Sequence, residues 1–135
     1  MSLTTEWVPF GDQGEFRGYA AWPSRAAGPL PAVLVLQEAW GVNAHIEDVT
    51  RRFAGAGYLA FAPDLFTRGG VRPAPLADER IQETVEFLSG LRPEERADPA
   101  GRAAALAKLA PDAQARIGET MATMFSGGYL PPAAN

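Results

Sequence analysis

The middle of this chain contains two wholly apolar runs separated by an amphipathic stretch. The runs cover residues 32–36 and 58–62, and each is followed at once by polar residues. Continuous apolar runs of this length are typical of strands that are covered on both faces, as in a parallel sheet. The pattern therefore predicts a strand–helix–strand unit over residues 31–66 with a right-handed crossover.

The stretch between the runs carries helix signals at both ends. Asn43 is a favourable N-cap residue, and Gly57 stands where a helix commonly ends in a left-handed residue. Between them Ile46, Val49 and Phe53 fall on one helical stripe. The sequence therefore predicts an amphipathic helix that packs its apolar stripe against the two strands.

Weaker patterns flank this unit. Strands are predicted over 4–10 and 15–22 with a hairpin connection at 11–14, and helices over 76–91, 98–110 and 112–125. In the last helix we expect four apolar side chains to point inward: Ile117, Met121, Met124 and Phe125. The predicted fold class is α/β, with an antiparallel hairpin leading into a mainly parallel sheet flanked by helices.

We expect one partial α/β domain over residues 1–135. Its predicted parts are a hairpin and loop (1–30), the strand–helix–strand core (31–66), and a loop with a helical segment (67–135). A composition of 47% hydrophobic and 21% charged residues indicates a globular chain long enough for a real core.

Charge and cysteine content narrow the possible functions. The net charge is −4 and the basic residues form no cluster, which argues against a nucleic-acid partner. The absence of cysteine excludes disulfides, cysteine zinc sites and a thiol nucleophile within this sequence. Polar residues follow Met1 and no apolar run approaches the roughly 20 residues of a membrane span, so we expect neither a signal peptide nor a membrane contact, and a cytoplasmic location.

The polar residues that directly follow the two apolar runs are the best candidates for chemistry, because ligands in open α/β sheets bind at the carboxyl ends of the strands. Gln37 and Glu38 follow the first run, and a carboxylate buried at this position would be costly unless it were hydrogen-bonded or functional. The structural alternative is that Glu38 only caps the turn through Gly41. For Asp64, after the second run, we favour a structural role in which its side chain holds a loop by hydrogen bonds to the backbone.

Other candidate residues have mainly structural interpretations. His45 is the sole histidine and is expected to be a partly exposed residue in the first turn of the central helix. Ser126 precedes two glycines but lacks a preceding glycine and strand, so a helix C-terminal turn is favoured over a nucleophile. The sequence contains no cluster of residues with the spacing of metal ligands, so we expect no metal. It also contains no glycine-rich phosphate loop after either strand, so we expect no nucleotide or other cofactor.

The segment VLVLQEAWGVNAHIEDVTRRFAGAGYLAFAPDLF resembles the dienelactone hydrolase family of α/β-hydrolases. The resemblance is strong over about residues 5–90. It implies that Glu38 lies beside the nucleophile and tunes it, and that the backbone N–H of Ala39 helps to form the oxyanion hole. It also implies that Arg68 and Arg80 lie on the substrate side. Trp40 is a further candidate for substrate binding, and two interpretations stay open for it: it lines a pocket, or it simply covers the sheet.

One departure from the family pattern concerns the substrate. Gln82 stands where the family has a carboxylate-binding arginine, which puts a dienelactone itself in doubt as the substrate. The family nucleophile, Asp and His occur in a later half that this sequence does not contain. The chain is therefore expected to be the N-terminal half of an ester or lactone hydrolase, supplying the oxyanion-hole side of the site.

An alternative is a non-catalytic, truncated hydrolase module that binds a partner chain or a small molecule. Neither apolar run contains a charge or proline that would protect a sheet edge. We therefore expect this edge to pair with a missing C-terminal half, a second chain or a copy of itself.

Overall fold

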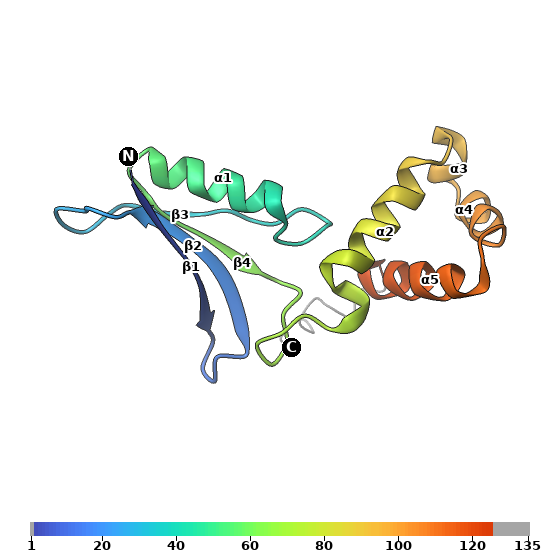
Figure 1. Cartoon of the computed structure of the whole chain (residues 1–135), viewed down its shortest axis with the longest axis horizontal. Coiled ribbons are helices and arrows are strands. Elements are labelled where there is room, and N and C mark those ends of the chain that lie inside the picture. The colour runs from blue at the N-terminus through green and yellow to red at the C-terminus, as the bar shows by residue number, and fades with distance from the viewer. Residues whose placement is uncertain (1, 126–135) are drawn as a thin grey trace, which may run out of the picture. The chain divides into compact units, whose positions relative to one another are not determined.

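A computed structural model describes residues 2–125 of the chain (Figure 1). The chain divides into two compact units, Met1–Arg72 and Pro73–Asn135. The first unit holds a sheet and one helix, and the described part of the second, residues 73–125, is helical.

The first unit contains a four-stranded mixed sheet. Its elements are β1 (Leu3–Phe10), β2 (Phe16–Pro23), β3 (Ala32–Leu34), α1 (Ala44–Gly55) and β4 (Leu59–Asp64). The strand order is β1-β2-β4-β3, in which β1 and β2 form an antiparallel hairpin, β2 and β4 are antiparallel, and β3 and β4 are parallel. The predicted α/β class, with a hairpin leading to a parallel strand pair joined by a helix, is confirmed.

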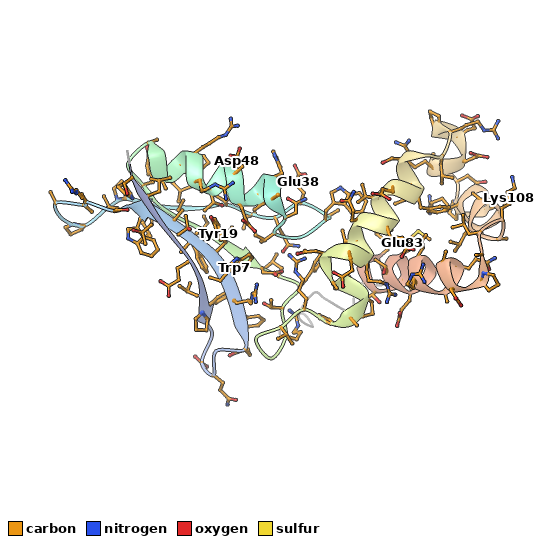
Figure 2. All side chains as sticks on the ribbon, viewed as in Figure 1. Trp7, Tyr19, Glu38, Asp48, Glu83 and Lys108 are labelled. Carbon is orange, nitrogen blue, oxygen red and sulfur yellow. The ribbon has the colours of Figure 1, made fainter. Side chains whose placement is uncertain are left out.

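Helix α1 covers one face of this sheet and forms the core with it (Figure 1). Buried residues from the strands, chiefly small ones such as Ala21 and Ala62, pack against Ile46 and Ala54 of α1. Small side chains let the helix lie close to the sheet. Trp7 of β1 and Tyr19 of β2 lie opposite each other within the hairpin and form an edge-to-face ring pair with centroids 5.5 Å apart; both residues are labelled in Figure 2.

The predicted caps of α1 are confirmed. The Asn43 side chain accepts a hydrogen bond from the Ile46 N–H at 3.1 Å. Gly57 follows the helix with a φ of 98°, which is the left-handed conformation expected at this position.

The expectation that residues 32–36 form a strand covered on both faces is wrong. Strand β3 ends at Leu34 and occupies the edge of the sheet. Val33 and Val35 pack against the α1 side, but Leu34 and Leu36 are 68% and 67% exposed. Both sets of side chains are apolar, so the sequence pattern alone does not reveal that only one face is covered.

The second unit begins with the short 3-10 helix η1 (Ala74–Leu76). Four α-helices follow: α2 (Asp78–Ser89), α3 (Pro93–Ala97), α4 (Pro99–Leu106) and α5 (Pro111–Phe125). Leu76, Ile81 and Ile117 are its buried apolar residues, where η1, α2 and α5 meet. The Thr120 hydroxyl, also buried, donates to the Pro75 carbonyl at 2.7 Å.

Several details of this unit differ from the sequence expectations. The predicted start of α4 is confirmed, because Asp98 accepts hydrogen bonds from the Ala100 and Gly101 N–H groups. However, α4 ends at Leu106, four residues before the predicted end at Ala110. The inward placement predicted for Phe125 in α5 is also wrong, because this residue is 65% exposed. Among the helices of residues 2–125, none combines the length and the apolar character needed to cross a membrane.

Candidate functional site

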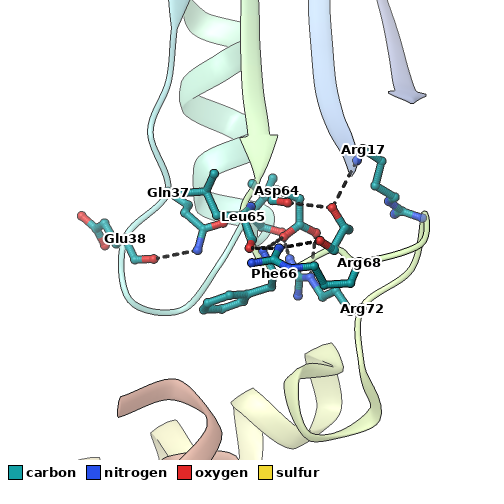
Figure 3. A network of polar contacts seen from close by, with 10 residues as sticks. Arg17, Gln37, Glu38, Asp64, Leu65, Phe66, Arg68 and Arg72 are labelled. Carbon is teal, nitrogen blue, oxygen red and sulfur yellow. Dashed lines mark hydrogen bonds and ion pairs between the residues drawn. The ribbon is translucent and has the colours of Figure 1, made fainter. Parts of the chain in front are cut away.

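The loops that follow β3 and β4 meet at the carboxyl ends of these parallel strands (Figure 3). The Leu65 N–H, just after β4, donates to the Gln37 side-chain oxygen at 2.8 Å. Gln37 in turn lies next to Glu38 in the loop after β3. The Gln37 side chain thus links the polar segments that follow β3 and β4, which the sequence predicted to lie at the same edge of the sheet.

A tight turn carries the predicted oxyanion-hole residues. The Gly41 N–H donates to the Glu38 carbonyl at 3.2 Å, and Gly41 adopts a φ of 83°. The hydrogen bond closes the turn with main-chain groups and does not use the Ala39 N–H. Glu38 and Ala39 are exposed, while Trp40 is half-buried.

The Glu38 carboxylate is therefore not the buried group that its position after an apolar run suggested. Figure 3 shows its side chain directed away from the cluster around Asp64. An exposed carboxylate remains solvated and needs no partner to be tolerated. The structural alternative was that Glu38 only caps the turn. The main chain of Glu38 does so, because its carbonyl accepts the hydrogen bond from the Gly41 N–H, but its side chain takes no part.

Asp64 is the buried acid of this site, with a side chain that is 1% exposed. Its Oδ1 accepts from the Phe66 N–H at 3.0 Å, which confirms the predicted loop-holding role. Its Oδ2 forms an ion pair with Arg72 Nε at 2.8 Å. The same guanidinium donates through Nη2 to the Val42 carbonyl at 2.8 Å, in the loop before α1.

Arg72 was missed by the sequence analysis. It stands in an irregular loop, and no local pattern connects it to Val42, which lies thirty positions earlier in the chain. The Arg72 guanidinium also lies over the Phe66 ring, 5.9 Å from its centroid. The Phe66 ring closely approaches Gly41, so Arg72, Phe66 and Gly41 lie together beneath the turn.

Thr67 connects the same loop to the hairpin. It is fully buried, and its hydroxyl donates to the Asp64 carbonyl at 2.8 Å. The hydroxyl oxygen accepts from the Arg17 N–H at the start of β2, at 3.1 Å. Thr67 thus joins the start of β2 to the end of β4, and Gln37 joins the loop after β3 to the loop after β4. These contacts hold the loop after β4 in place.

The two arginines predicted to bind substrate have different surroundings. Arg68 lies in the first unit, where its Nη1 donates to the carbonyls of Leu65 and Thr67 at 2.9 and 2.7 Å. Arg80 belongs to the second unit, where its Nη2 donates to the Glu119 carboxylate at 2.7 Å. Substrate binding by Trp40, Arg68 and Arg80 stays a prediction.

The remaining candidates add no chemistry to this site. His45 is exposed in the first turn of α1, as its structural interpretation predicted. Ser126 lies outside the described residues. Within residues 2–125, no three histidine or carboxylate side chains gather as ligands of a metal ion would.

Comparison with known proteins assigns the chain to a family. The sequence model described as "Dienelactone hydrolase family" matches residues 16–127. This chain belongs to the dienelactone hydrolase family.

Two curated relatives agree with this assignment. The chain is 35% identical over 109 residues to a protein of Azospirillum brasilense named "Putative carboxymethylenebutenolidase", a match that covers 77% of this chain and 47% of that protein. It is 50% identical over 75 residues to a Yersinia pestis protein of the same name, covering 51% and 28% of the two chains. A solved structure titled "Crystal Structure of Putative Dienelactone Hydrolase from Klebsiella pneumoniae subsp. pneumoniae MGH 78578" is 45% identical, with a TM-score of 0.46, and the match covers 49% of this chain and 28% of that one.

These matches involve only part of each relative. The chain spans about half or less of the length of the curated relatives that it matches.

Proposed function

We propose that this chain supplies the oxyanion-hole side of an active site that hydrolyses carboxylic esters or lactones. In this proposal the backbone N–H of Ala39 donates to the oxyanion that forms when a nucleophile attacks the acyl carbonyl. Glu38 lies beside that nucleophile and tunes it. The nucleophile, Asp and His come from a polypeptide segment outside this sequence, which contains no cysteine and no Gly-x-Ser-x-Gly motif.

The observation that carries the proposal is the rigid connection between the two strand ends. The Gln37 side chain ties the loop of Glu38 to Leu65, and the Arg72 guanidinium ties it to Asp64. An oxyanion hole requires N–H dipoles that are fixed before the reaction, because reorganisation during the reaction would cancel their benefit. The hydrogen bond that closes the turn from Glu38 to Gly41, and the contacts of Gln37 and Arg72 on either side of it, support this proposal.

In this proposal different groups stabilise the oxyanion and bind the substrate. A preorganised N–H donor stabilises the developing negative charge by about 3–4 kcal/mol, which corresponds to roughly 10²–10³ in rate. Trp40, half-buried beside Ala39, offers an apolar surface for the acyl group, and Arg68 offers a positive charge on the same unit. These groups bind and polarise a substrate, but they cannot attack it.

The test uses the purified full chain and Glu38→Gln, with Glu6→Gln as a matched control on the exposed side of β1. We would determine the denatured intact mass of every polypeptide in the sample and then measure turnover of p-nitrophenyl acetate. The proposal predicts a second polypeptide with a Gly-x-Cys-x-Gly or Gly-x-Ser-x-Gly motif, and ester turnover that Glu38→Gln lowers at least about tenfold. Unchanged turnover in Glu38→Gln would refute the role of this residue.

A second candidate function is a non-catalytic module that binds a partner chain. The exposure of Leu34 and Leu36 at the sheet edge favours it, because monomeric proteins rarely leave such an edge open. A single 14.4 kDa species without ester turnover would select this function over the catalytic one.

A further inference from the structure

The Gln37 side chain replaces a main-chain acceptor where the β3–β4 ladder ends. The Val35 N–H donates to the Phe61 carbonyl at 2.8 Å, so residue 61 of β4 faces β3, and residues 63 and 65 follow on the same side. Pro63 has no N–H, and the main-chain ladder therefore cannot continue through it. The next N–H in this series, that of Leu65, donates to the Gln37 side-chain oxygen at 2.8 Å.

The nitrogen of the same Gln37 amide contacts the turn that carries the proposed oxyanion donor. Gln37 Nε2 donates to the Glu38 carbonyl at 3.5 Å, a long hydrogen bond that Figure 3 draws as a dashed line. The Gly41 N–H donates to the same carbonyl at 3.2 Å. The bond from Gly41 holds this carbonyl relative to the turn, whereas the bond from Gln37 connects it to Leu65 in the loop after β4.

The Glu38 carbonyl and the Ala39 N–H belong to one peptide unit. No cis peptide bond occurs in the part of the chain that the structure describes, so this unit is trans and planar, and its C=O and N–H point in opposite directions. The two donors that hold the Glu38 carbonyl therefore also set the direction of the Ala39 N–H. Hydrogen bonds to the carbonyl polarise the peptide as well, which strengthens its N–H as a donor.

We propose that Gln37 is a positioning residue of the oxyanion hole. Its amide bridges the Leu65 N–H and the Glu38 carbonyl, and it thereby fixes the direction in which the Ala39 N–H points. An oxyanion donor needs a fixed direction before the reaction begins, because its benefit depends on preorganisation. The inference rests on the proposed function for its catalytic meaning, but the bridge lies within the first unit and is measurable without turnover.

The bridge requires an acceptor and a donor on one side chain, which only an amide of this length supplies here. Gln37→Met keeps the length of the side chain and removes both groups. Gln37→Glu keeps the acceptor for the Leu65 N–H but offers no donor to the Glu38 carbonyl. Gln13→Met, at an exposed position in the hairpin turn of the same unit, is the matched control.

The first measurement is ¹⁵N relaxation of the labelled full chain. We expect the Ala39 N–H to have an order parameter of about 0.85 in the unmodified chain and below about 0.6 in Gln37→Met and Gln37→Glu. The Val42 N–H should keep its order parameter, because the Arg72 guanidinium holds the Val42 carbonyl independently of Gln37. Gln13→Met should change neither value, and far-UV circular dichroism establishes that each variant is folded.

The second measurement is turnover of p-nitrophenyl acetate by the same sample that tests the proposed function. We expect Gln37→Met to lower kcat at least about tenfold and to change KM less than about twofold, because the oxyanion donor acts on the transition state. Gln13→Met should leave both constants unchanged.

The two measurements separate this inference from the proposed function. An unchanged Ala39 order parameter in both Gln37 variants would overturn the bridge and leave the proposed function intact. A value that falls in Gln37→Met but not in Gln37→Glu would reduce the role of Gln37 to an anchor on Leu65. A lowered order parameter with an unchanged kcat would overturn the catalytic role of the bridge. No turnover in the unmodified sample would instead overturn the proposed function, while the relaxation data would still decide whether Gln37 fixes the Ala39 N–H.

Discussion

Replacing Arg72 with alanine tests whether the buried ion pair holds the strand-end site together. The Asp64 side chain is 1% exposed and that of Arg72 is 12% exposed, so both charges are largely removed from water. The substitution leaves the Asp64 carboxylate with the Phe66 N–H, and it leaves the Val42 carbonyl without its 2.8 Å donor. Stranding one member of a buried pair usually costs 3–5 kcal/mol, and because Arg72 is partly reached by water we expect about 3 kcal/mol.

This loss is large enough to measure by urea unfolding. A change of about 3 kcal/mol alters the unfolding equilibrium about 100-fold, and with a slope of about 1.5 kcal/mol per molar urea it lowers the midpoint by about 2 M. All three tryptophans lie in the unit Met1–Arg72, so their fluorescence reports on this unit. Arg25→Ala, which removes the same charge from an exposed loop position, should change the stability by less than about 0.5 kcal/mol.

A double variant separates the stranded charge from lost packing. Asp64→Asn together with Arg72→Leu removes both charges and keeps much of the side-chain volume, so it should be less destabilising than Arg72→Ala alone. If Arg72→Ala lowers the stability by less than about 1 kcal/mol, the ion pair does not hold the two loops, and the preorganisation argument for the turn at Glu38–Gly41 fails.

Three further predictions concern single contacts of the two units. Gly41→Ala should destabilise the chain by about 1–3 kcal/mol in the same urea assay, because a Cβ at a φ of 83° would lie 2.9 Å from the Phe66 ring. Gly28→Ala is the control and should be neutral or slightly stabilising, because a Cβ at Gly28 would have no atom within 4 Å. Asn43→Ala should cost about 1 kcal/mol through the lost N-cap of α1, and Asn43→Asp should restore most of it. In the second unit the Arg116 guanidinium lowers the pKa of Glu83, so this pair stabilises the fold above the ordinary pKa of 4.5 and loses its effect as the pH falls through the lowered value. Arg116→Gln should therefore reduce the melting temperature, followed by circular dichroism, more at pH 7 than at pH 3, and an equal reduction at both values would contradict this explanation.

The sequence predicted correctly those features that depend on residues close together in the chain. The ends of α1 follow from Asn43 and Gly57, which act on their own helix within one turn. The meeting of the loops after β3 and β4 follows from parallel pairing, which places both carboxyl ends at one edge. The start of α4 at Asp98-Pro99 is another short-range signal, and it was also predicted correctly.

Features that depend on distant residues were not predictable in this way. The contact of Arg72 with Val42 requires the whole strand–helix–strand unit to fold before the two residues meet. The exposure of Leu34 depends on what covers the second face of the sheet, and an apolar residue looks the same whether that face is covered or open. Likewise, Glu38 follows an apolar strand yet stays exposed, because β3 lies at the edge of the sheet.

The contacts at the strand ends bear directly on the proposed oxyanion hole. Side-chain bonds from Gln37, Arg72 and Thr67 fix the strand ends within the first unit, so the proposed oxyanion-hole turn is formed before any partner binds. Arg72→Ala therefore tests the geometry of this turn as well as the stability of the first unit, because the substitution removes the donor of the Val42 carbonyl and the partner of Asp64.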